Sequence, residues 1–238
     1  MTLLFGTINT GSSQLAWDDL LIASHCDFLL FQEPPGSKGR DASVTKRSFI
    51  KGYEVHSGRR AGIAVKNHLA KRCTVLKKEP DFVIIRYGVG DTSFIIISYY
   101  QEQNLIASEC LNSLETTLTN FSNSKIIIGG DWNASKREWI ANSSAPGGEL
   151  HSRGAALERF AAAHGFSISQ PSGPTRINHC LDFFISRGIP INNLRREDVV
   201  KTDHKMVTGV INDPQQISFM GMGNFGKFIV IVHGFLNS

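Results

Sequence analysis

An aspartate and an asparagine stand two residues apart, directly after a short run of isoleucines. Asp131 and Asn133 follow the sequence Ile-Ile-Ile-Gly-Gly, which begins at Ile126. A continuous β-branched run is typical of a strand buried on both faces, so polar chemistry begins abruptly at its carboxyl end. Because side chains alternate along an extended backbone, we expect the carboxylate and the amide to point to the same side. An ordinary Asp-x-Asn turn is the competing interpretation of this motif alone.

Two glycines stand immediately before the aspartate. Gly129 and Gly130 lack a Cβ, and such residues let backbone or ligand approach where a larger residue would block it. They are therefore a second indication of a functional site at this strand end.

Two further polar residues stand where other strands are expected to end. Residues 3–9 and 27–31 are predicted strands with a helix between them, an arrangement that usually makes a parallel pair. Asn9 and Glu33 are then neighbours at one edge of the sheet. For Glu33 alone, a solvated acid at a strand end is the competing interpretation.

One aspartate lies in an apolar context and needs a partner. Asp182 is flanked by a leucine and two phenylalanines in a predicted strand, where burial of a carboxylate is costly unless something pairs with it. The best candidate is the triplet Thr202-Asp203-His204, which precedes a predicted strand at residues 206–211.

The elements that must position these residues alternate between strands and helices. Other strands are expected at residues 53–57, 62–65, 72–77, 81–87, 94–100 and 166–169, and helices at 14–25, 108–120, 135–141 and 153–164. The strands between residues 53 and 87 suggest a meander. Two sets of strands with returning helices predict an α/β sandwich. Polar residues at so many strand ends suggest one shared rim, comprising Asn9, Glu33, Tyr100, Asp131, Asn133, Asp182, Asp203 and His204.

Composition bounds the class of protein. With 238 residues, of which 41% are hydrophobic and 19% charged, the chain is expected to form one main domain rather than a disordered one. Its four cysteines form no Cys-x-x-Cys pair, which argues against a zinc knuckle or redox motif. No signal peptide or apolar run of membrane-spanning length is visible, so we expect an intracellular protein without a membrane partner.

Positive charge is concentrated in one segment. Residues 38–78 carry twelve Lys or Arg against two acids, a local balance of +10 in a chain whose net charge is +4. Such a cluster attracts polyanions. Solvated charges on loops and edge strands are the competing interpretation.

Taken in order, these motifs resemble the endonuclease/exonuclease/phosphatase superfamily, the fold of pancreatic-type DNases and apurinic endonucleases. Within it, the chain is most similar to the endonuclease domain of non-LTR retrotransposons. The matching motifs span residues 9–204 and are Ile8-Asn9, Gln32-Glu33-Pro34, Ser98-Tyr99-Tyr100, Gly130-Asp131-Trp132-Asn133-Ala134, Leu181-Asp182-Phe183-Phe184 and Thr202-Asp203-His204.

The resemblance implies a four-layer α/β sandwich, in which two packed mixed β-sheets are flanked by helices. This catalytic domain is expected at residues 1–212, and residues 213–238 remain an unassigned tail, either an extra strand or a linker. The implied activity is magnesium-dependent nicking of double-stranded DNA, with Mn²⁺ able to replace Mg²⁺. The nick leaves a 3′ hydroxyl for target-primed reverse transcription, within a longer polyprotein that contains a reverse transcriptase and acts in the nucleus.

Metal binding is implied for three residues. By resemblance, Glu33 holds the divalent ion, helped by Asn9 and Asp203. Magnesium suits such a set, because it is usually held by one or two carboxylates while it keeps waters and substrate phosphate.

Roles in the reaction are implied for five more residues. Asp131, placed by Asn133, orients or deprotonates the attacking water. Tyr100 and His204 contact the scissile phosphate and stabilise the negative charge that develops there. Asp182 braces His204 by a hydrogen bond and raises its pKa.

DNA contacts are implied in two places. Residues 176–179 correspond to the hairpin that probes the groove in the family, although an ordinary polar turn is an equal alternative. The basic segment would track phosphates. The candidate DNA contacts are Thr175, Arg176, His179, Arg59, Arg60 and Thr202.

The sequence departs from the family pattern after Tyr100, where Gln101-Glu102-Gln103 stands in place of a common proline. An off-by-one pairing there would turn Tyr99 to the site instead. Thr202 stands where serine is usual.

Three alternatives to a DNA-nicking enzyme remain open. The same rim suits an apurinic-site nuclease or a phosphatase. A non-catalytic DNA-binding domain would use only the basic segment. A degenerate relative would keep the fold without the chemistry, but the complete set of acids and amides favours activity.

Overall fold

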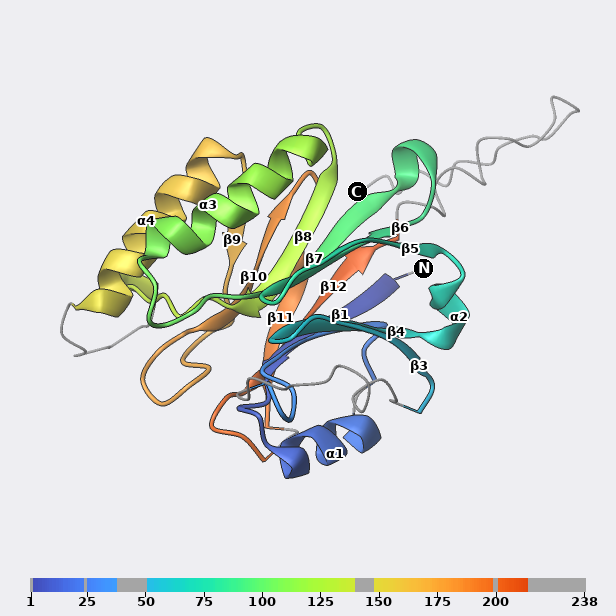
Figure 1. Ribbon diagram of the computed structural model, residues 1–238, viewed down its shortest axis with the longest axis horizontal. Helices are drawn as coiled ribbons and strands as arrows, with labels where there is room; N and C mark the ends of the chain where they lie inside the picture. Colours follow the sequence, from blue (N-terminus) through green and yellow to red (C-terminus); the bar gives the residue numbers. More distant parts are fainter. Residues whose placement is uncertain (1, 24, 38–50, 140–147, 199–200, 214–238) are drawn as a thin grey trace, which may run out of the picture.

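The structure is a computed structural model that describes residues 2–23, 25–37, 51–139, 148–198 and 201–213. Its strands form two sheets that pack face to face, each with six strands in this part of the chain (Figure 1). Helix α1 (Gln14–Ala23) covers the outer face of one sheet, and helices α3 (Ala107–Leu118) and α4 (Glu149–Ala163) lie side by side on the outer face of the other. This is the expected four-layer α/β sandwich.

The first sheet is built around the N-terminal strand. Its strand order is β11-β12-β1-β2-β4-β3. The bounds are β1 (Thr2–Asn9), β2 (Phe28–Gln32), β3 (Tyr53–Ser57), β4 (Ala61–Lys66), β11 (Asn192–Glu197) and β12 (Met206–Asn212). The predicted parallel pair of β1 and β2 is confirmed, with Asn9 opposite Gln32, so Glu33 follows directly at the same edge.

The second sheet is built around the isoleucine strand. Its order is β5-β6-β7-β8-β10-β9. The bounds are β5 (Cys73–Lys78), β6 (Phe82–Tyr87), β7 (Phe94–Tyr100), β8 (Lys125–Asp131), β9 (Ser167–Ser169) and β10 (Asp182–Arg187). Tyr100 on β7 and Asp182 on β10 both lie opposite Asp131 at the end of β8. Three strand ends thus place three polar side chains in a row.

The layers are held together by apolar side chains on alternating faces of the strands. On β8, Ile127 packs between the two sheets, whereas Ile126 and Ile128 pack against α3 and α4. The strand is therefore buried on both faces, as its continuous apolar run predicts. Helix α1 packs Trp17 and Leu20 against the other sheet.

The remaining helical turns in the described part of the chain are short. They are α2 (Asn67–Ala70), η2 (Gly90–Thr92), η3 (Thr119–Phe121) and η4 (Arg137–Trp139). The helix predicted at 135–141 is represented by η4, and its last residues lie outside the described residues. None of the described helices is both long and apolar enough to cross a membrane.

One expectation about the strands needs correction, and one strand was missed. The predicted meander between residues 53 and 87 is two hairpins in different sheets, because α2 carries the chain from β4 in one sheet to β5 in the other. Strand β11 was not predicted. Its exposed, polar sequence lies at the edge of the sheet, where no apolar periodicity is needed. The tail beyond residue 213 lies outside the described residues.

Candidate active site

One amide joins two acids at the rim of the sandwich. The Nδ2 atom of Asn9 donates to Oε2 of Glu33 at 3.1 Å and to Oδ2 of Asp131 at 2.7 Å. Its Oδ1 atom accepts a hydrogen bond from the backbone of Gly11, which fixes the orientation of the amide. Residues from β1, β2 and β8, far apart in the chain, thus meet in one hydrogen-bonded group.

Two of the predicted site residues have left-handed backbone conformations. Glu33 has φ +44° and Asn133 has φ +42°. Such conformations cost roughly 1–3 kcal/mol in residues other than glycine and persist where the surroundings fix them. The backbone of Glu33 donates to the carbonyl of Arg60 and accepts from Ser12 and Thr10. Strain collected at two neighbouring strand ends favours a functional role for both residues.

Asp131 is fully buried, with hydrogen bonds to both carboxylate oxygens. Oδ2 accepts from Asn9, and Oδ1 accepts from the backbone N–H of Asn133 at 3.0 Å. Burial and the nearby Asp182 carboxylate raise the pKa of Asp131 to about 7, against the opposing effects of His204 and these two hydrogen bonds. A carboxylate in this state is able to accept a proton near neutral pH.

Asp182 and His204 form a buried pair. Nδ1 of His204 lies 2.7 Å from Oδ2 of Asp182, and the same oxygen accepts the hydroxyl of Thr175 at 2.8 Å. Burial by itself would lower the pKa of His204, but the Asp182 carboxylate, with Asp131 and Asp203, outweighs it and raises that pKa to about 9. The imidazole is therefore protonated at neutral pH, and both ring nitrogens carry a hydrogen.

Tyr100, and not Tyr99, faces the rim. Its hydroxyl forms a hydrogen bond with Glu33, and burial, Glu33 and Asp131 all raise its pKa, so the hydroxyl keeps its proton. Tyr99 points to the other side of β7, where its ring packs 5.0 Å from that of Trp132. The predicted register is therefore the one that the structure has.

Two donor sets at the rim could hold a divalent cation. Glu33 and Asp131 offer oxygen atoms on either side of the Asn9 amide, which fits Mg²⁺. The second set is Asp131, Asp182 and His204, whose ligand atoms lie within 4.8 Å of one another. Oδ1 of Asp182 has no hydrogen-bond partner among the described residues, which favours that set. The raised pKa of His204 argues against it, because an imidazolium cannot ligate a metal.

Asp203 lies beside the hairpin of residues 176–179, where it pairs with Arg176. Its Oδ2 atom accepts from Nε of Arg176 at 2.7 Å. Partial burial by itself would raise the pKa of Asp203. The positive charges of His204 and Arg176 and the hydrogen bond from Arg176 outweigh it, so that pKa is lowered. The structure thus gives Asp203 an ion-pair partner, and its predicted metal role stays a prediction.

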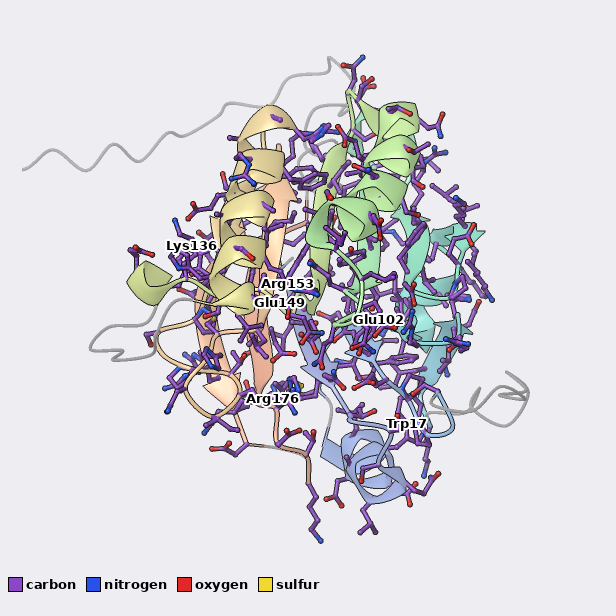
Figure 2. All side chains as sticks on the ribbon, turned by 60° about the vertical axis from the view of Figure 1, so that its left-hand side comes forward. Trp17, Glu102, Lys136, Glu149, Arg153 and Arg176 are labelled. Carbon is purple, nitrogen blue, oxygen red and sulfur yellow. The ribbon has the colours of Figure 1, made fainter. Side chains whose placement is uncertain are left out.

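Residues 176–179 form the expected tight hairpin. Arg176 pairs with His179 by backbone hydrogen bonds. Its backbone also lies opposite that of His204 in an isolated antiparallel β-bridge. Ile177 stands at the tip with φ +46° and is 78% exposed. Beside the hairpin lies a cavity of about 280 Å³, bounded by α4 and the loop after β7. Figure 2 shows Arg176 on one side of this region and Arg153 with Glu149 on the other.

Three of the residues predicted to contact DNA form hydrogen bonds or ion pairs with other residues of the chain. Thr175 is fully buried, and its hydroxyl bonds Asp182. Arg60 pairs with Asp81 at 2.5 Å and with Glu102, and its guanidinium lies 5.2 Å from the centre of the Tyr100 ring. The hydroxyl of Thr202 donates to the carbonyl of Asn9 at 3.1 Å. These contacts help to hold the site together, and the predicted roles of the three residues in contacting DNA stay predictions.

In the described part of the basic segment, residues 51–78, the positive charges do not all lie along the rim. Residues 38–50 lie outside the described residues. Lys66 and Arg72 lie at the end of the sheets away from the rim, paired with Asp27 and Asp213 respectively. Arg59 is exposed beside the rim, in the turn between β3 and β4.

Sequence reasoning missed two residues that support the site. Gln103 donates from Nε2 to Oδ1 of Asn133 at 2.8 Å, and Arg153 holds the loop that contains Gln103. The only signal was the departure from proline after Tyr100, which marked this loop as unusual without naming the residues that replace it.

The fold and the rim together define the class: a pancreatic-DNase-like four-layer sandwich with Asn, Glu, Asp and His at the ends of its strands. The resemblance to the endonuclease/exonuclease/phosphatase superfamily, and within it to the endonuclease domain of non-LTR retrotransposons, is confirmed. Residues 94–208, just under half of the chain, match the family described as endonuclease-reverse transcriptase.

Solved structures show the same fold. The endonuclease domain of TRAS1, a telomere-specific non-LTR retrotransposon, is 19% identical with a TM-score of 0.70, covering 88% of this chain and 98% of that one. The AP endonuclease LMAP of Leishmania major is 13% identical with a TM-score of 0.61, covering 89% of this chain and 88% of that one. A humanized D. rerio TDP2 with 14 mutations is 12% identical with a TM-score of 0.60, covering 89% of this chain and 99% of that one. No curated protein matches the sequence.

Proposed function

We propose that this chain is a divalent-metal-dependent endonuclease that nicks double-stranded DNA. The family match and the retrotransposon and AP-endonuclease neighbours support a nuclease function on this fold. The observation that carries the proposal for this chain is the joining of Glu33 and Asp131 through Asn9, beside the protonated His204. These residues provide a cation site, a proton acceptor and a positive charge within one rim.

The residues divide the work of phosphodiester hydrolysis. Asp131, held by Asn9 and Asn133, accepts a proton from the attacking water. The His204 imidazolium, held by Asp182, and the neutral Tyr100 hydroxyl donate hydrogen bonds to phosphate oxygens as negative charge develops. The water oxygen bonds to phosphorus, the bond between phosphorus and the 3′ oxygen breaks, and that oxygen takes up a proton from solvent while Asp131 releases its proton to solvent.

A bound divalent cation would add Lewis-acid stabilisation of the same negative charge. Glu33 and Asp131, with Asn9 orienting them, are the residues that would hold it, and Mg²⁺ is the ion that this oxygen-rich set fits best. Mn²⁺ should be able to replace it.

The proposed product is a 3′ hydroxyl that primes reverse transcription. The family match supports the further proposal that the chain is part of a longer polyprotein with a reverse transcriptase. Action on chromosomal DNA in the nucleus is proposed with it, because that is where a primed reverse transcription of this kind would take place.

A nicking assay on supercoiled plasmid tests the proposal. Nicking should require Mg²⁺, stop with EDTA, and fall by about a hundredfold or more in Asp131→Ala and His204→Ala. Asp18→Asn removes an exposed acid of α1 and should leave nicking unchanged. A DNA polymerase should extend the nicks directly if they end in a 3′ hydroxyl. Full activity in both rim variants would overturn the assigned mechanism.

An apurinic-site nuclease is the second candidate, which the Leishmania major neighbour favours. Comparing an abasic duplex with the intact duplex separates the two, since a specific apurinic-site enzyme would leave the intact duplex uncut. An inositol phosphate tests for a phosphatase. Salt-dependent DNA binding without any metal-dependent cleavage would instead indicate a non-catalytic DNA-binding domain.

A further inference from the structure

A buried arginine of α4 grips the loop that follows β7. Only 3% of Arg153 is exposed. Its guanidinium donates to the carbonyls of Glu102 at 2.9 Å, of Leu105 at 2.7 Å, and of Gln103. Glu149, one turn earlier on α4, accepts from Nε and Nη2 and fixes the plane of the group (Figure 2). A planar donor with several N–H groups suits three carbonyls, because each can receive its own hydrogen bond.

The same loop is held from its other side by Arg60. The carboxylate of Glu102 pairs with Nη1 of Arg60, whose Nε pairs with Asp81. The Tyr100 backbone N–H donates to the carbonyl of Asp81 at 2.8 Å. The loop therefore has one arginine on its carbonyls and another on its one acidic side chain.

The gripped loop determines the orientation of Asn133. Nε2 of Gln103 donates to Oδ1 of Asn133 at 2.8 Å, and Nδ2 of Asn133 donates to the carbonyl of Gln101 at 2.7 Å. Both ends of the asparagine amide are thus bound to the loop. The backbone N–H of Asn133 in turn donates to Oδ1 of Asp131. An unbroken chain of hydrogen bonds connects α4 to the proposed proton acceptor.

We propose that Arg153 is a positioning residue for phosphodiester hydrolysis: it fixes the loop after β7 so that Gln103 and Asn133 hold Asp131 in its reactive orientation. The inference rests on the proposed function. It explains the departure seen in the sequence, since Gln101-Glu102-Gln103 has no proline to restrict its backbone and the two arginines supply the missing rigidity. Arg153 acts through the loop and does not itself contact Asp131 in any hydrogen bond.

A double-mutant cycle separates this role from simple support of the fold. Arg153→Met should lower kcat about tenfold with KM changed less than twofold, because a misplaced proton acceptor slows the chemical step. In a Gln103→Ala background the same change should lower kcat by less than about twofold, because the connection is already broken. Arg159→Met, which removes an exposed arginine of the same helix, is the matched control and should change neither constant.

A measurement independent of activity accompanies the cycle. The side-chain amide resonances of Asn133 should shift in Arg153→Met and in Gln103→Ala, and stay in place in Arg159→Met. Arg153→Lys keeps the charge but has fewer donors, so its kcat should lie between those of the wild type and Arg153→Met. If Arg153→Met does not fold, Arg153→Lys replaces it in the double-mutant cycle and in the measurement of the Asn133 resonances.

The outcomes are distinct for the two proposals. Equal loss of kcat in both backgrounds, or unchanged Asn133 resonances in a folded Arg153 variant, would overturn the positioning role. A wild-type protein that cuts no DNA would overturn the proposed function, while the resonances still decide whether Arg153 orients Asn133.

Discussion

The Nδ1 atom of His204 lies 2.7 Å from Oδ2 of Asp182, and the two side chains are almost completely enclosed. We expect Asp182→Asn to bring the pKa of His204 from about 9 toward its ordinary value of about 6.5, because burial then acts without the main opposing charge. An NMR titration of the His204 ring measures this directly. Nuclease activity at pH 7.5 should fall by about a hundredfold.

The same pair should make stability depend on pH. Because the folded-state pKa of His204 is raised, its contribution is fully present below about pH 6.5 and is lost as the pH rises through about 9. At about 1.36 kcal/mol per pKa unit, the contribution is of the order of 3 kcal/mol. Urea unfolding between pH 6 and pH 10 measures it. A slope in Asp182→Asn as steep as in the wild type would show that another group is responsible.

Divalent-ion binding should distinguish the two donor sets at the rim. Glu33→Gln should weaken Mn²⁺ binding by about tenfold to a hundredfold if Glu33 and Asp131 hold the ion. Asp182→Asn should then have little effect on Mn²⁺ binding, because in this arrangement Asp182 is the partner of His204 and not a ligand of the ion. Electron paramagnetic resonance of Mn²⁺ in titrations of both variants gives the answer. The opposite order of effects would assign the ion to Asp131, Asp182 and His204.

The sequence was sufficient to predict the site where local pattern determines position. The isoleucines of β8 alternate between two apolar layers, so the strand and its end at Asp131 followed from the run itself. The parallel pairing of β1 and β2 followed from the strand-helix-strand order, and it brings Asn9 beside Glu33. The partner of Asp182 followed from the cost of burying an unpaired acid.

Long-range contacts of ordinary surface residue types could not be predicted in this way. Nothing local distinguishes Arg153 from other polar residues of α4, because its burial depends on a loop some 50 residues earlier in the chain. Arg60 was expected to contact DNA because it lies in a basic segment, yet its partners are Asp81 and Glu102 on other strand connections. β11 escaped notice because an edge strand needs no apolar face.

Gly130→Ala should disrupt the site by moving a strand. A Cβ at this position would lie 2.0 Å from the backbone carbonyl oxygen of Tyr99, so β7 and β8 would have to separate. We expect a loss of about 2–4 kcal/mol in the free energy of unfolding and at least a tenfold loss of nicking, because overpacking shifts the backbone that positions Asp131.

The matched control for that change is Gly90→Ala. It places a methyl group where no atom lies within 4 Å, at a glycine far from the rim with φ +59°. The cost there should come only from the left-handed backbone and remain about 1 kcal/mol. Thermal and urea unfolding of both variants, with nicking assays, measure the difference. Equal loss of nicking in the two would contradict the tight packing of β7 against β8.

Two adjacent arginines should respond differently to the same substitution. Arg60→Gln removes a partner from Asp81 and Glu102 inside the rim, and we expect it to lower the free energy of unfolding by about 1–3 kcal/mol. Arg59 is exposed, so Arg59→Gln should leave stability unchanged and weaken DNA binding, with the slope of log K against log salt reduced by about 1. Urea unfolding and fluorescence-anisotropy binding at several salt concentrations test both. If Arg60→Gln instead reduced the salt slope without changing stability, Arg60 would contact phosphate, and the ion pairs that hold it within the rim would have to open on DNA binding.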